Sequence, residues 1–220
     1  MRVLIACEES QVITKQFRKL GHEAFSCDLL PCSGGHPEWH FQDDALEIAI
    51  RWKWDLMIAH PPCTFLAVSG ARWMYNKDGS INQDRLNKQN EALNFVQRLM
   101  DVPIDKIAVE NPISVISTKI RKPDQIIQPY MFGDKAQKST CLWLKNLPKL
   151  VPTDIVDKGE FTEFISKKGV KKKQPKWYFD ALKDSKSPEE RRTLRSKTFP
   201  GMAKAIATQY SEYIINLNKQ

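Results

Sequence analysis

Short apolar runs, separated by amphipathic stretches, mark out the first half of the chain. Runs of this length, bounded by polar or turn-forming residues, are typical of strands buried in a sheet. They occupy residues 2–7, 23–28, 54–59 and 106–109. Because helical patterns fall between them, we predict an α/β fold built on a doubly wound, mostly parallel sheet.

Apolar positions at helical spacing lie between these predicted strands. In the first such stretch Ile13, Phe17 and Leu20 recur at the spacing of one helix face. Ser10 is placed to cap this helix and Gly21 to end it. Further helices are predicted over residues 46–52, 82–100 and 202–217.

The pattern changes after Pro152. Residues 157–197 are rich in lysine and arginine, with aromatic side chains among the charges and few regularly spaced apolar positions. We therefore expect a catalytic and cofactor-binding core over residues 1–152, a small basic substrate-recognition segment over 153–198, and a C-terminal helix over 199–220 that packs back on the core.

Composition narrows the class of protein. A chain of 220 residues with 41% hydrophobic residues fits one compact domain, or a core with a small appendage. No apolar run is long enough to span a bilayer, and the first residues form a predicted strand rather than a secretion signal. The five cysteines are scattered, which argues against a disulfide framework. We therefore expect a cytoplasmic protein with no membrane partner.

The balance of charge favours a polyanionic partner. The net charge is +8, from 34 basic and 26 acidic residues. Basic residues that neutralise phosphates release counterions, which stabilises a complex with nucleic acid. The simpler alternative is that this charge only keeps the protein in solution.

Polar residues and cysteines directly follow several predicted strands. In a doubly wound sheet, ligands bind outside the carboxyl ends of the strands. The segments placed there are 7–10, 27–28, 60–63 and 110–112. Asp28, at the end of the second predicted strand, is well placed to bind the hydroxyls of a ribose.

Cys63 follows two prolines at one of these strand ends. The prolines restrict the backbone and so hold the next side chain in one direction. A cysteine there can attack as a thiolate if its pKa is lowered. Alternatively, the prolines only end a strand and Cys63 fills a small buried space. Glu110 favours the catalytic interpretation, because an acid at a neighbouring strand end could meet Cys63 over one substrate.

The order of these elements resembles the DNA cytosine-5 methyltransferases, and among them small phage-encoded members. The features that carry the resemblance occur in this order: an N-terminal strand and turn, Asp28, Asp43 or Asp44, Pro61-Pro62-Cys63, and Glu110-Asn111. Segments 127–133, 140–144 and 195–201 add to it. The resemblance covers nearly the whole chain and is weakest over residues 157–190.

This resemblance implies methylation of carbon 5 of cytosine in double-stranded DNA, with S-adenosylmethionine as the cofactor. Cys63 would attack carbon 6 of the ring, and Glu110 would contact N3 and the exocyclic amine. A base inside a duplex is out of reach, so the target cytosine would be flipped out of the helix. No obligate protein partner is implied.

The resemblance also implies a set of cofactor-binding residues. The first turn would hold the methionine part, Asp28 the ribose, and Asp43 or Asp44 the region of the adenine. The complete set is Cys7, Glu8, Glu9, Ser10, Asp28, Asp43, Asp44 and Pro61. The first turn departs from the glycine-rich loop of the family, and the absence of a G-x-G-x-x-G motif argues against a dinucleotide dehydrogenase.

Candidate DNA contacts are basic and aromatic residues, together with one residue from the Pro-Pro-Cys turn and one from the Glu-Asn turn. They are Pro62, Asn111, Arg72, Lys138, Lys171, Lys172, Lys173 and Trp177. The glutamine-and-arginine motif of the family is represented only loosely by residues 137–140, so Arg72 and Lys138 are candidates for the missing positive charge. Lysines beside aromatics, with Lys167 and Lys168 in the same run, suit phosphate contact and base stacking. The alternative is a solvated loop whose aromatics anchor it to the core.

Other functions stay open. Cys27, Cys32, His36 and His40 have a spacing that zinc could use, but Cys27 lies in a predicted strand beside Asp28, and we expect no metal. The same scaffold could act on RNA or a free cytosine nucleotide. A third possibility is a catalytically silent nucleic-acid-binding relative, against which the presence of both Cys63 and Glu110 speaks.

Overall fold

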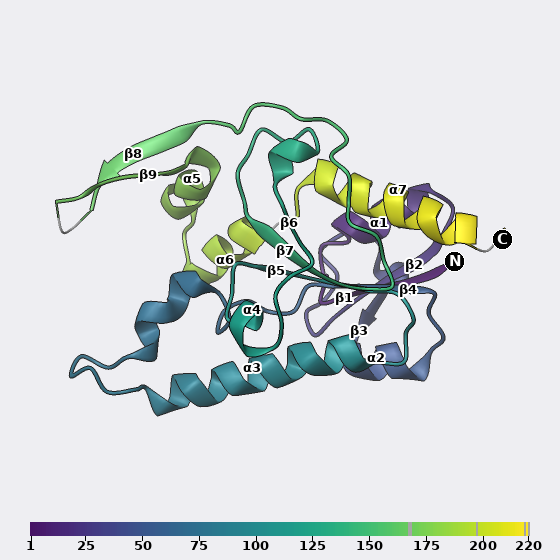
Figure 1. The fold of residues 1–220 in the computed structure, drawn as a ribbon, viewed down its shortest axis with the longest axis horizontal. Coiled ribbons are helices and arrows are strands. Elements are labelled where there is room, and N and C mark those ends of the chain that lie inside the picture. Colours follow the sequence, from purple (N-terminus) through teal and green to yellow (C-terminus); the bar gives the residue numbers. More distant parts are fainter. Residues whose placement is uncertain (167–168, 197, 218, 220) are drawn as a thin grey trace. The chain divides into compact units, whose positions relative to one another are not determined.

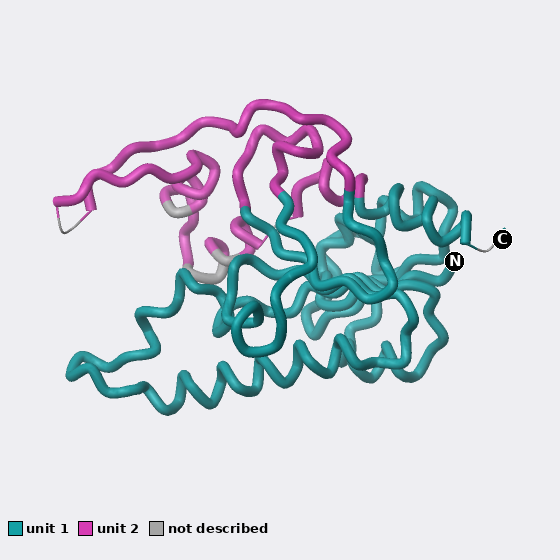
Figure 2. The backbone as a smooth tube through the Cα atoms, viewed as in Figure 1, with its two compact units in different colours: residues 1–127, 139–150, 206–220 teal, residues 128–138, 151–205 magenta. Residues whose placement is uncertain are grey.

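The computed structural model describes residues 1–166, 169–196, 198–217 and 219 (Figure 1). The chain forms two compact units (Figure 2). The first unit comprises residues 1–127, 139–150 and 206–220, and the second comprises residues 128–138 and 151–205.

A seven-stranded sheet forms the centre of the first unit. Its strands lie in the order β3-β2-β1-β4-β5-β7-β6. Their bounds are β1 (Arg2–Ala6), β2 (Glu23–Asp28), β3 (His40–Gln42), β4 (Leu56–Ala59), β5 (Ile107–Pro112), β6 (Gln125–Ile127) and β7 (Thr140–Lys145). Strands β1 to β5 pair in parallel, and β7 is antiparallel to both β5 and β6. The predicted doubly wound, mostly parallel α/β sheet is confirmed.

Helices cover both faces of this sheet. Their bounds are α1 (Val12–Lys19), α2 (Ala45–Arg51), α3 (Gln83–Asp101), α4 (Ile116–Lys119) and α7 (Pro200–Leu217), with 3-10 turns η1 (Pro37–Trp39) and η2 (Val68–Met74). Figure 1 shows α1 and α7 on one face and α2 and α3 on the other. His22, which follows α1, bonds to Ser211 of α7 at 2.9 Å. No helix in the described part of the chain is both long and apolar enough to cross a membrane.

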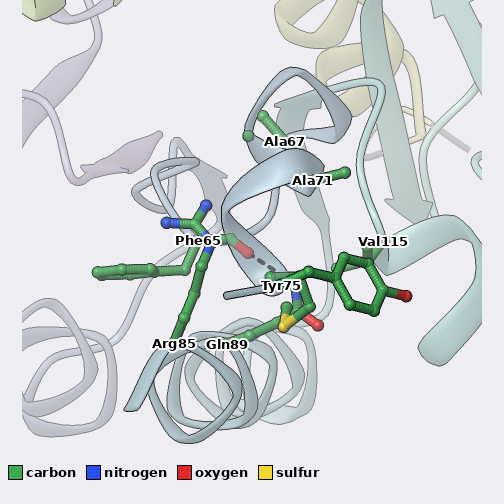
Figure 3. Close-up of a pocket in the computed structure, with 9 residues that line it drawn as sticks. Phe65, Ala67, Ala71, Tyr75, Arg85, Gln89 and Val115 are labelled. Atoms are coloured by element: carbon green, nitrogen blue, oxygen red, sulfur yellow. Dashed lines mark hydrogen bonds between the residues drawn. The ribbon is translucent and has the colours of Figure 1, made fainter. Parts of the chain in front are cut away.

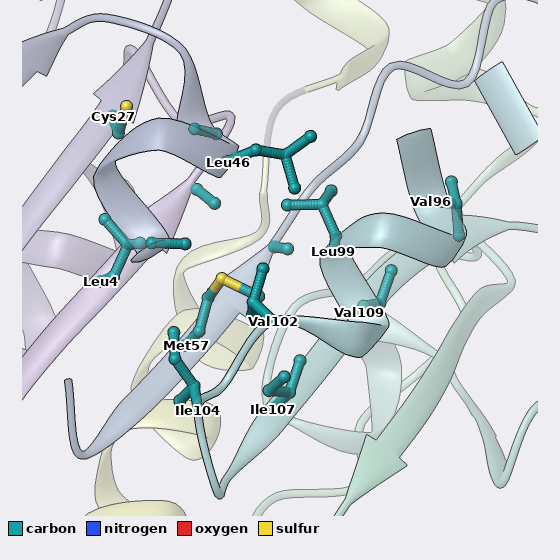
Figure 4. Close-up of a cluster of buried hydrophobic side chains, with 14 of the residues drawn as sticks. Leu4, Cys27, Leu46, Met57, Val96, Leu99, Val102, Ile104, Ile107 and Val109 are labelled. Atoms are coloured by element: carbon teal, nitrogen blue, oxygen red, sulfur yellow. The ribbon is translucent and has the colours of Figure 1, made fainter. Parts of the chain in front are cut away.

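The strands are buried on both faces, which is why they read as continuous apolar runs. On β1, Leu4 and Ala6 belong to one core cluster with Val96 and Leu99 of α3 (Figure 4). The intervening residues of β1 point to the opposite face, since side chains alternate along a strand, and they are also fully buried. This rigid double layer fixes the carboxyl ends of the strands, where the candidate site lies.

The start of α1 differs from the expectation that Ser10 caps it. The N-cap position is Gln11, whose backbone is left-handed (φ 58°) and whose side chain makes no capping bond. Instead the Glu8 carboxylate accepts from the Ile13 amide at 2.7 Å and from the Thr14 amide at 3.3 Å. A carboxylate there also complements the positive end of the helix dipole.

The second unit has more regular structure than its sequence pattern predicts. It contains η3 (Pro129–Met131), the antiparallel hairpin of β8 (Phe161–Ile165) and β9 (Lys171–Pro175), and the helices α5 (Lys176–Asp184) and α6 (Pro188–Ser196). The predicted recognition segment of residues 153–198 lies within this unit, but residues 128–138 join it as well. They do so because their backbone bonds to residues 153–156, for example from the Gly133 amide to the Asp154 carbonyl at 2.8 Å.

Candidate active site

The direction of winding of the sheet reverses between β1 and β4. These two strands are neighbours, with β2 and β3 outside one and β5 outside the other. Such a switch point is where open α/β sheets bind ligands. The His60 amide donates to the Ala6 carbonyl at 2.9 Å, so the turns after β1 and β4 begin side by side. The structure therefore brings residues 7–10 and 60–63 to one edge.

Glu110 lies beside His60 at the same edge. Ala59 of β4 pairs with Val109 of β5, which places the next residue of each strand alongside the other. His60 Nδ1 and Glu110 Oε2 are 2.9 Å apart, and the two side chains are only 14% and 19% exposed. No role for His60 was expected from the sequence. Its only signal was its position immediately before the two prolines.

The turn that carries Cys63 is held on both sides. Before it, the buried Asn111 side chain donates from Nδ2 to the Pro61 carbonyl at 2.8 Å. After it, the amides of Leu66 and Ala67 donate to the Cys63 carbonyl at 3.0 and 2.9 Å. Pro62 is exposed and Cys63 is half-buried. Asn111 is thus placed to fix the turn and is covered from solvent, whereas Pro62 is accessible.

Three of the other cysteines are poor nucleophiles. Burial raises the pKa of Cys27 to about 12 and that of Cys141 to about 11. Burial, together with the nearby Asp28 carboxylate, also raises the pKa of Cys7 far above its usual value. A thiol with such a pKa stays protonated at neutral pH, and only the thiolate attacks. Cys63 is half-buried at the end of the turn that follows β4.

In the turn after β1, the side chain of the first acid, Glu8, points into the fold and not towards the candidate site. Cys7 has a left-handed backbone (φ 59°), which starts the turn. The Glu8 side chain is buried beneath α1, and the burial raises its pKa, while the charge of His60 and the bonds from Thr14 act in the opposite direction. Glu9 and Ser10 are half-buried. The Glu8 carboxylate therefore points into the fold, and it occupies the helix start where a dinucleotide phosphate would otherwise bind.

The acids after β2 and β3 differ in their surroundings. Asp28 is half-buried at the end of β2 and accepts from the Leu30 amide at 2.9 Å. The Asp44 carboxylate caps α2 by accepting from the Leu46 amide at 2.7 Å. The Asp43 side chain is 44% exposed and pairs with Arg51 at 3.6 Å. Asp43 Oδ1 also accepts from the Asp44 amide at 2.8 Å, and of the two adjacent residues Asp44 is the more exposed.

Arg72 lies in the segment that follows Cys63. Its guanidinium carbon is 4.5 Å from the ring centre of Trp73, and both residues are exposed on η2. Next to them is a cavity of about 170 Å³ (Figure 3). Its lining residues are Phe65, Ala67, Gly70, Ala71, Met74, Tyr75, Arg85, Gln89 and Val115. Neither Cys63 nor Glu110 is among these lining residues.

Two of the candidate DNA contacts in the second unit, Trp177 and Lys138, have partners within that unit. Trp177 donates from Nε1 to the Gln137 carbonyl at 3.2 Å and packs edge-on against Phe199, and both partners belong to the second unit. Lys138 Nζ lies 3.4 Å from the Ser196 carbonyl.

The lysines of β9 alternate between the faces of the hairpin. Lys171 reaches Glu163 at 2.6 Å, and the Lys173 Nζ lies 4.6 Å from the ring centre of Phe161. Lys172 pairs with Phe164, which packs on α5, and so projects from the other face. All three are exposed. Lys167, Lys168 and Lys197 lie outside the described residues.

The cysteine and histidine series has other contacts. Cys27 Sγ donates to the Asp43 carbonyl, His36 stacks on Trp39, and His40 Nδ1 lies 2.8 Å from Ser26 Oγ. Over the ranges that the structure describes, no three His, Cys, Asp or Glu side chains are grouped so as to hold a metal ion.

Comparisons with known proteins give likenesses of fold. No protein-family model matches the chain, and no curated protein matches it. Among solved structures it is similar to a mutant of DNMT2 from Spodoptera frugiperda, with 12% identity over 72% of this chain and 57% of that one, and a TM-score of 0.46. It is also similar to an E. coli protein encoded within a prophage and described as a candidate DNA modification methyltransferase, with 12% identity over 83% of this chain and 64% of that one, and a TM-score of 0.39. The chain thus spans less than two thirds of the length of either protein.

Proposed function

We propose that this chain is an S-adenosylmethionine-dependent methyltransferase that methylates carbon 5 of cytosine in DNA through a covalent bond to Cys63. The observation that carries the proposal is the arrangement at the ends of β4 and β5. There the Pro-Pro-Cys turn is held by Asn111, while Glu110 is held by His60 in the neighbouring position. A nucleophile and an acid are thereby fixed at one edge, at the switch point of the sheet.

Cytosine chemistry explains why both groups are needed. Carbon 5 is a weak nucleophile until the aromatic ring is broken. The Cys63 thiolate forms a bond to carbon 6, and the electron pair of the ring double bond is drawn towards N3, where the Glu110 carboxyl supplies a proton. Carbon 5 then has enamine character and can take a methyl group.

Product release reverses the first step. Once carbon 5 is methylated, a water molecule acting as base removes the proton from that carbon. The electron pair left behind restores the ring double bond and expels Cys63 as a thiolate. The proton on N3 returns to Glu110. Cys63 and Glu110 finish in the states in which they began, as a catalyst requires.

The residues at the switch point fit the cofactor. S-adenosylmethionine supplies a methyl group on a positively charged sulfonium, and it also carries an ammonium group, ribose hydroxyls and a flat adenine. Asp28, Asp43 and Glu9 offer carboxylates that suit the positive charges and the hydroxyls. Leu29 and Leu30, 74% and 59% exposed directly after Asp28, offer apolar surface for the adenine. With Glu8 occupying the start of α1, the same edge is unsuited to the phosphates of a dinucleotide.

A polymeric nucleic acid is the substrate that the charge and the exposed loop favour. The net charge of +8 suits a polyanion. Arg72 and Trp73 expose a cation and a flat ring immediately after the Cys63 turn, and the lysines of β9 are exposed on the second unit. Such residues contact phosphates and stack on bases. A free nucleotide would leave these groups unused.

Transfer of a labelled methyl group tests the proposal. Purified protein is incubated with duplex DNA and S-adenosylmethionine carrying a tritiated methyl group, and the DNA is then digested to nucleosides. We expect the label in 5-methyldeoxycytidine, and none with the Cys63→Ser variant. A Cys32→Ser variant is the matched control and should keep the wild-type rate. Label in another nucleoside, or in RNA only, would contradict the assignment of substrate.

A further inference from the structure

His60 stands between two carboxylates at the switch point. On the β5 side its Nδ1 lies 2.9 Å from Glu110 Oε2. On the β1 side its amide bonds to Ala6, and the charge of its ring acts on the carboxylate of Glu8. Each of these acids is largely or fully covered from solvent. A ring in this position links the first turn of the fold to the acid of the proposed reaction.

A negative charge on Glu110 favours a proton on this ring, whereas burial of the ring opposes it. Cys63 lies in the same turn as His60, and the Glu110 charge helps to raise the pKa of Cys141 on β7. The His60 ring, 2.9 Å from the Glu110 carboxylate, is a group beside this acid that can carry a positive charge.

We propose that His60 is a positioning residue that orients the Glu110 carboxyl and shares with it the proton that cytosine N3 takes up. This rests on the proposed function. The pair holds one exchangeable proton, either on Nδ1 or on the carboxyl group. It passes from the carboxyl to N3 as the bond from Cys63 to carbon 6 forms, and it returns to the pair when Cys63 leaves. No further proton donor is needed for that step.

Two substitutions separate orientation from proton sharing. His60→Asn places an amide NH2 near the position of Nδ1, so it keeps a donor to Glu110 but cannot carry the proton. His60→Ala removes both. We expect His60→Asn to lower kcat about 10²-fold with KM for DNA within about twofold of wild type, and His60→Ala to lower kcat further. The alkaline limb of the kcat profile against pH should be lost or displaced in His60→Asn.

His36→Asn is the matched control. His36 also pairs with a glutamate, at 3.1 Å to Glu38, but this pair is exposed on η1. Its substitution should change neither kcat nor the pH profile. If His60→Asn keeps the wild-type rate and profile, the proposal is wrong. If kcat, DNA affinity and thermal stability fall together in His60→Asn, the role is purely structural and the proposal is also wrong.

A measurement without turnover keeps this inference separate from the proposed function. The ring signals of His60 can be followed by NMR against pH, with His60→Asn used to assign them among the four histidines. We expect the pH at which they change to fall in Glu110→Gln, because the neighbouring negative charge is removed, while the signals of His22 stay unchanged. No change in His60 would overturn the pairing. A shift in a protein that methylates nothing would keep the pairing and reject the proposed function.

Discussion

Asn111 donates a hydrogen bond from its buried side-chain amide to the carbonyl of Pro61, two residues before Cys63. The bond joins the end of β5 to the turn after β4. Since the turn has no regular secondary structure of its own, this bond and those to the Cys63 carbonyl determine where the thiol points. The residue next to the proposed acid thus controls the position of the proposed nucleophile.

Asn111→Ala should therefore act on the covalent step. The substitution leaves the Pro61 carbonyl without its donor, which should lower the free energy of unfolding by about 1–3 kcal/mol. A displaced thiol should slow attack on carbon 6 by about 10²-fold. The rate of adduct formation with DNA and the equilibrium affinity for DNA are measured on the same protein. An equal loss in both, or no loss in either, would contradict a positioning role.

Glu8 should make stability depend on pH. Burial raises its pKa in the folded state above the ordinary value of 4.5. Over the range between these two values the folded state binds more protons than the unfolded state, so the free energy of unfolding falls as pH rises. Glu8→Gln removes the titration and should flatten this part of the profile. Urea unfolding at a series of pH values checks this, with Glu9→Gln as the control that should keep the wild-type slope.

The cysteines should differ sharply in reactivity. Raised pKa values keep Cys7, Cys27 and Cys141 as thiols at neutral pH, and the last two are also buried. We expect a thiol-alkylating reagent to modify Cys63 and Cys32, which are half-buried, well before these three. Peptide mapping by mass spectrometry reads out the order. Early modification of Cys27 or Cys141 in the folded protein would contradict the environment described for them.

The loop after Cys63 should contribute to DNA binding through two interactions that can be measured separately, a phosphate contact and base stacking. Arg72→Ala should weaken binding and reduce the dependence of affinity on salt by about one phosphate contact. Trp73→Ala should weaken binding by about 1–3 kcal/mol without changing that dependence, because stacking involves no counterion release. Fluorescence anisotropy at several salt concentrations measures both.

Trp52→Ala is the control for this loop. Trp52 is 44% exposed, compared with 57% for Trp73, but it follows α2 and precedes β4, away from the carboxyl ends of the strands. It should leave DNA affinity unchanged. A similar loss of affinity in Trp52→Ala and Trp73→Ala would contradict a specific role of the loop after Cys63 in DNA binding.

Much of the fold could be predicted because its strands are buried on both faces. The apolar runs that became β1, β2, β4 and β5 were visible for that reason, as were the helices between them. Residues 40–42 form too short a strand to show a period. The antiparallel direction of β7 had no signal in its apolar run, because direction depends on pairing with β5 and β6.

The candidate site could be predicted only as far as strand ends. Glu110 directly follows an apolar run, and Cys63 follows one after a histidine and two prolines, so both were expected near strand ends. In the structure β5 continues through Glu110 to Pro112. The contact between His60 and Glu110 depends on the register of β4 against β5, which no local pattern contains. The inward direction of the Glu8 side chain likewise depends on how α1 packs. The sequence alone therefore could not distinguish an acid that caps this helix from an acid that binds a ligand.

Covalent trapping on DNA that contains 5-fluorocytosine tests directly whether Cys63 is the nucleophile. Fluorine at carbon 5 cannot leave as a proton does, so a complex that has added Cys63 and accepted a methyl group cannot eliminate. We predict an adduct that survives denaturing electrophoresis, needs S-adenosylmethionine, maps to the peptide containing Cys63 and is absent in Cys63→Ser. Methyl transfer to DNA without any such adduct, or an adduct on another cysteine, would contradict the central claim that Cys63 is the nucleophile.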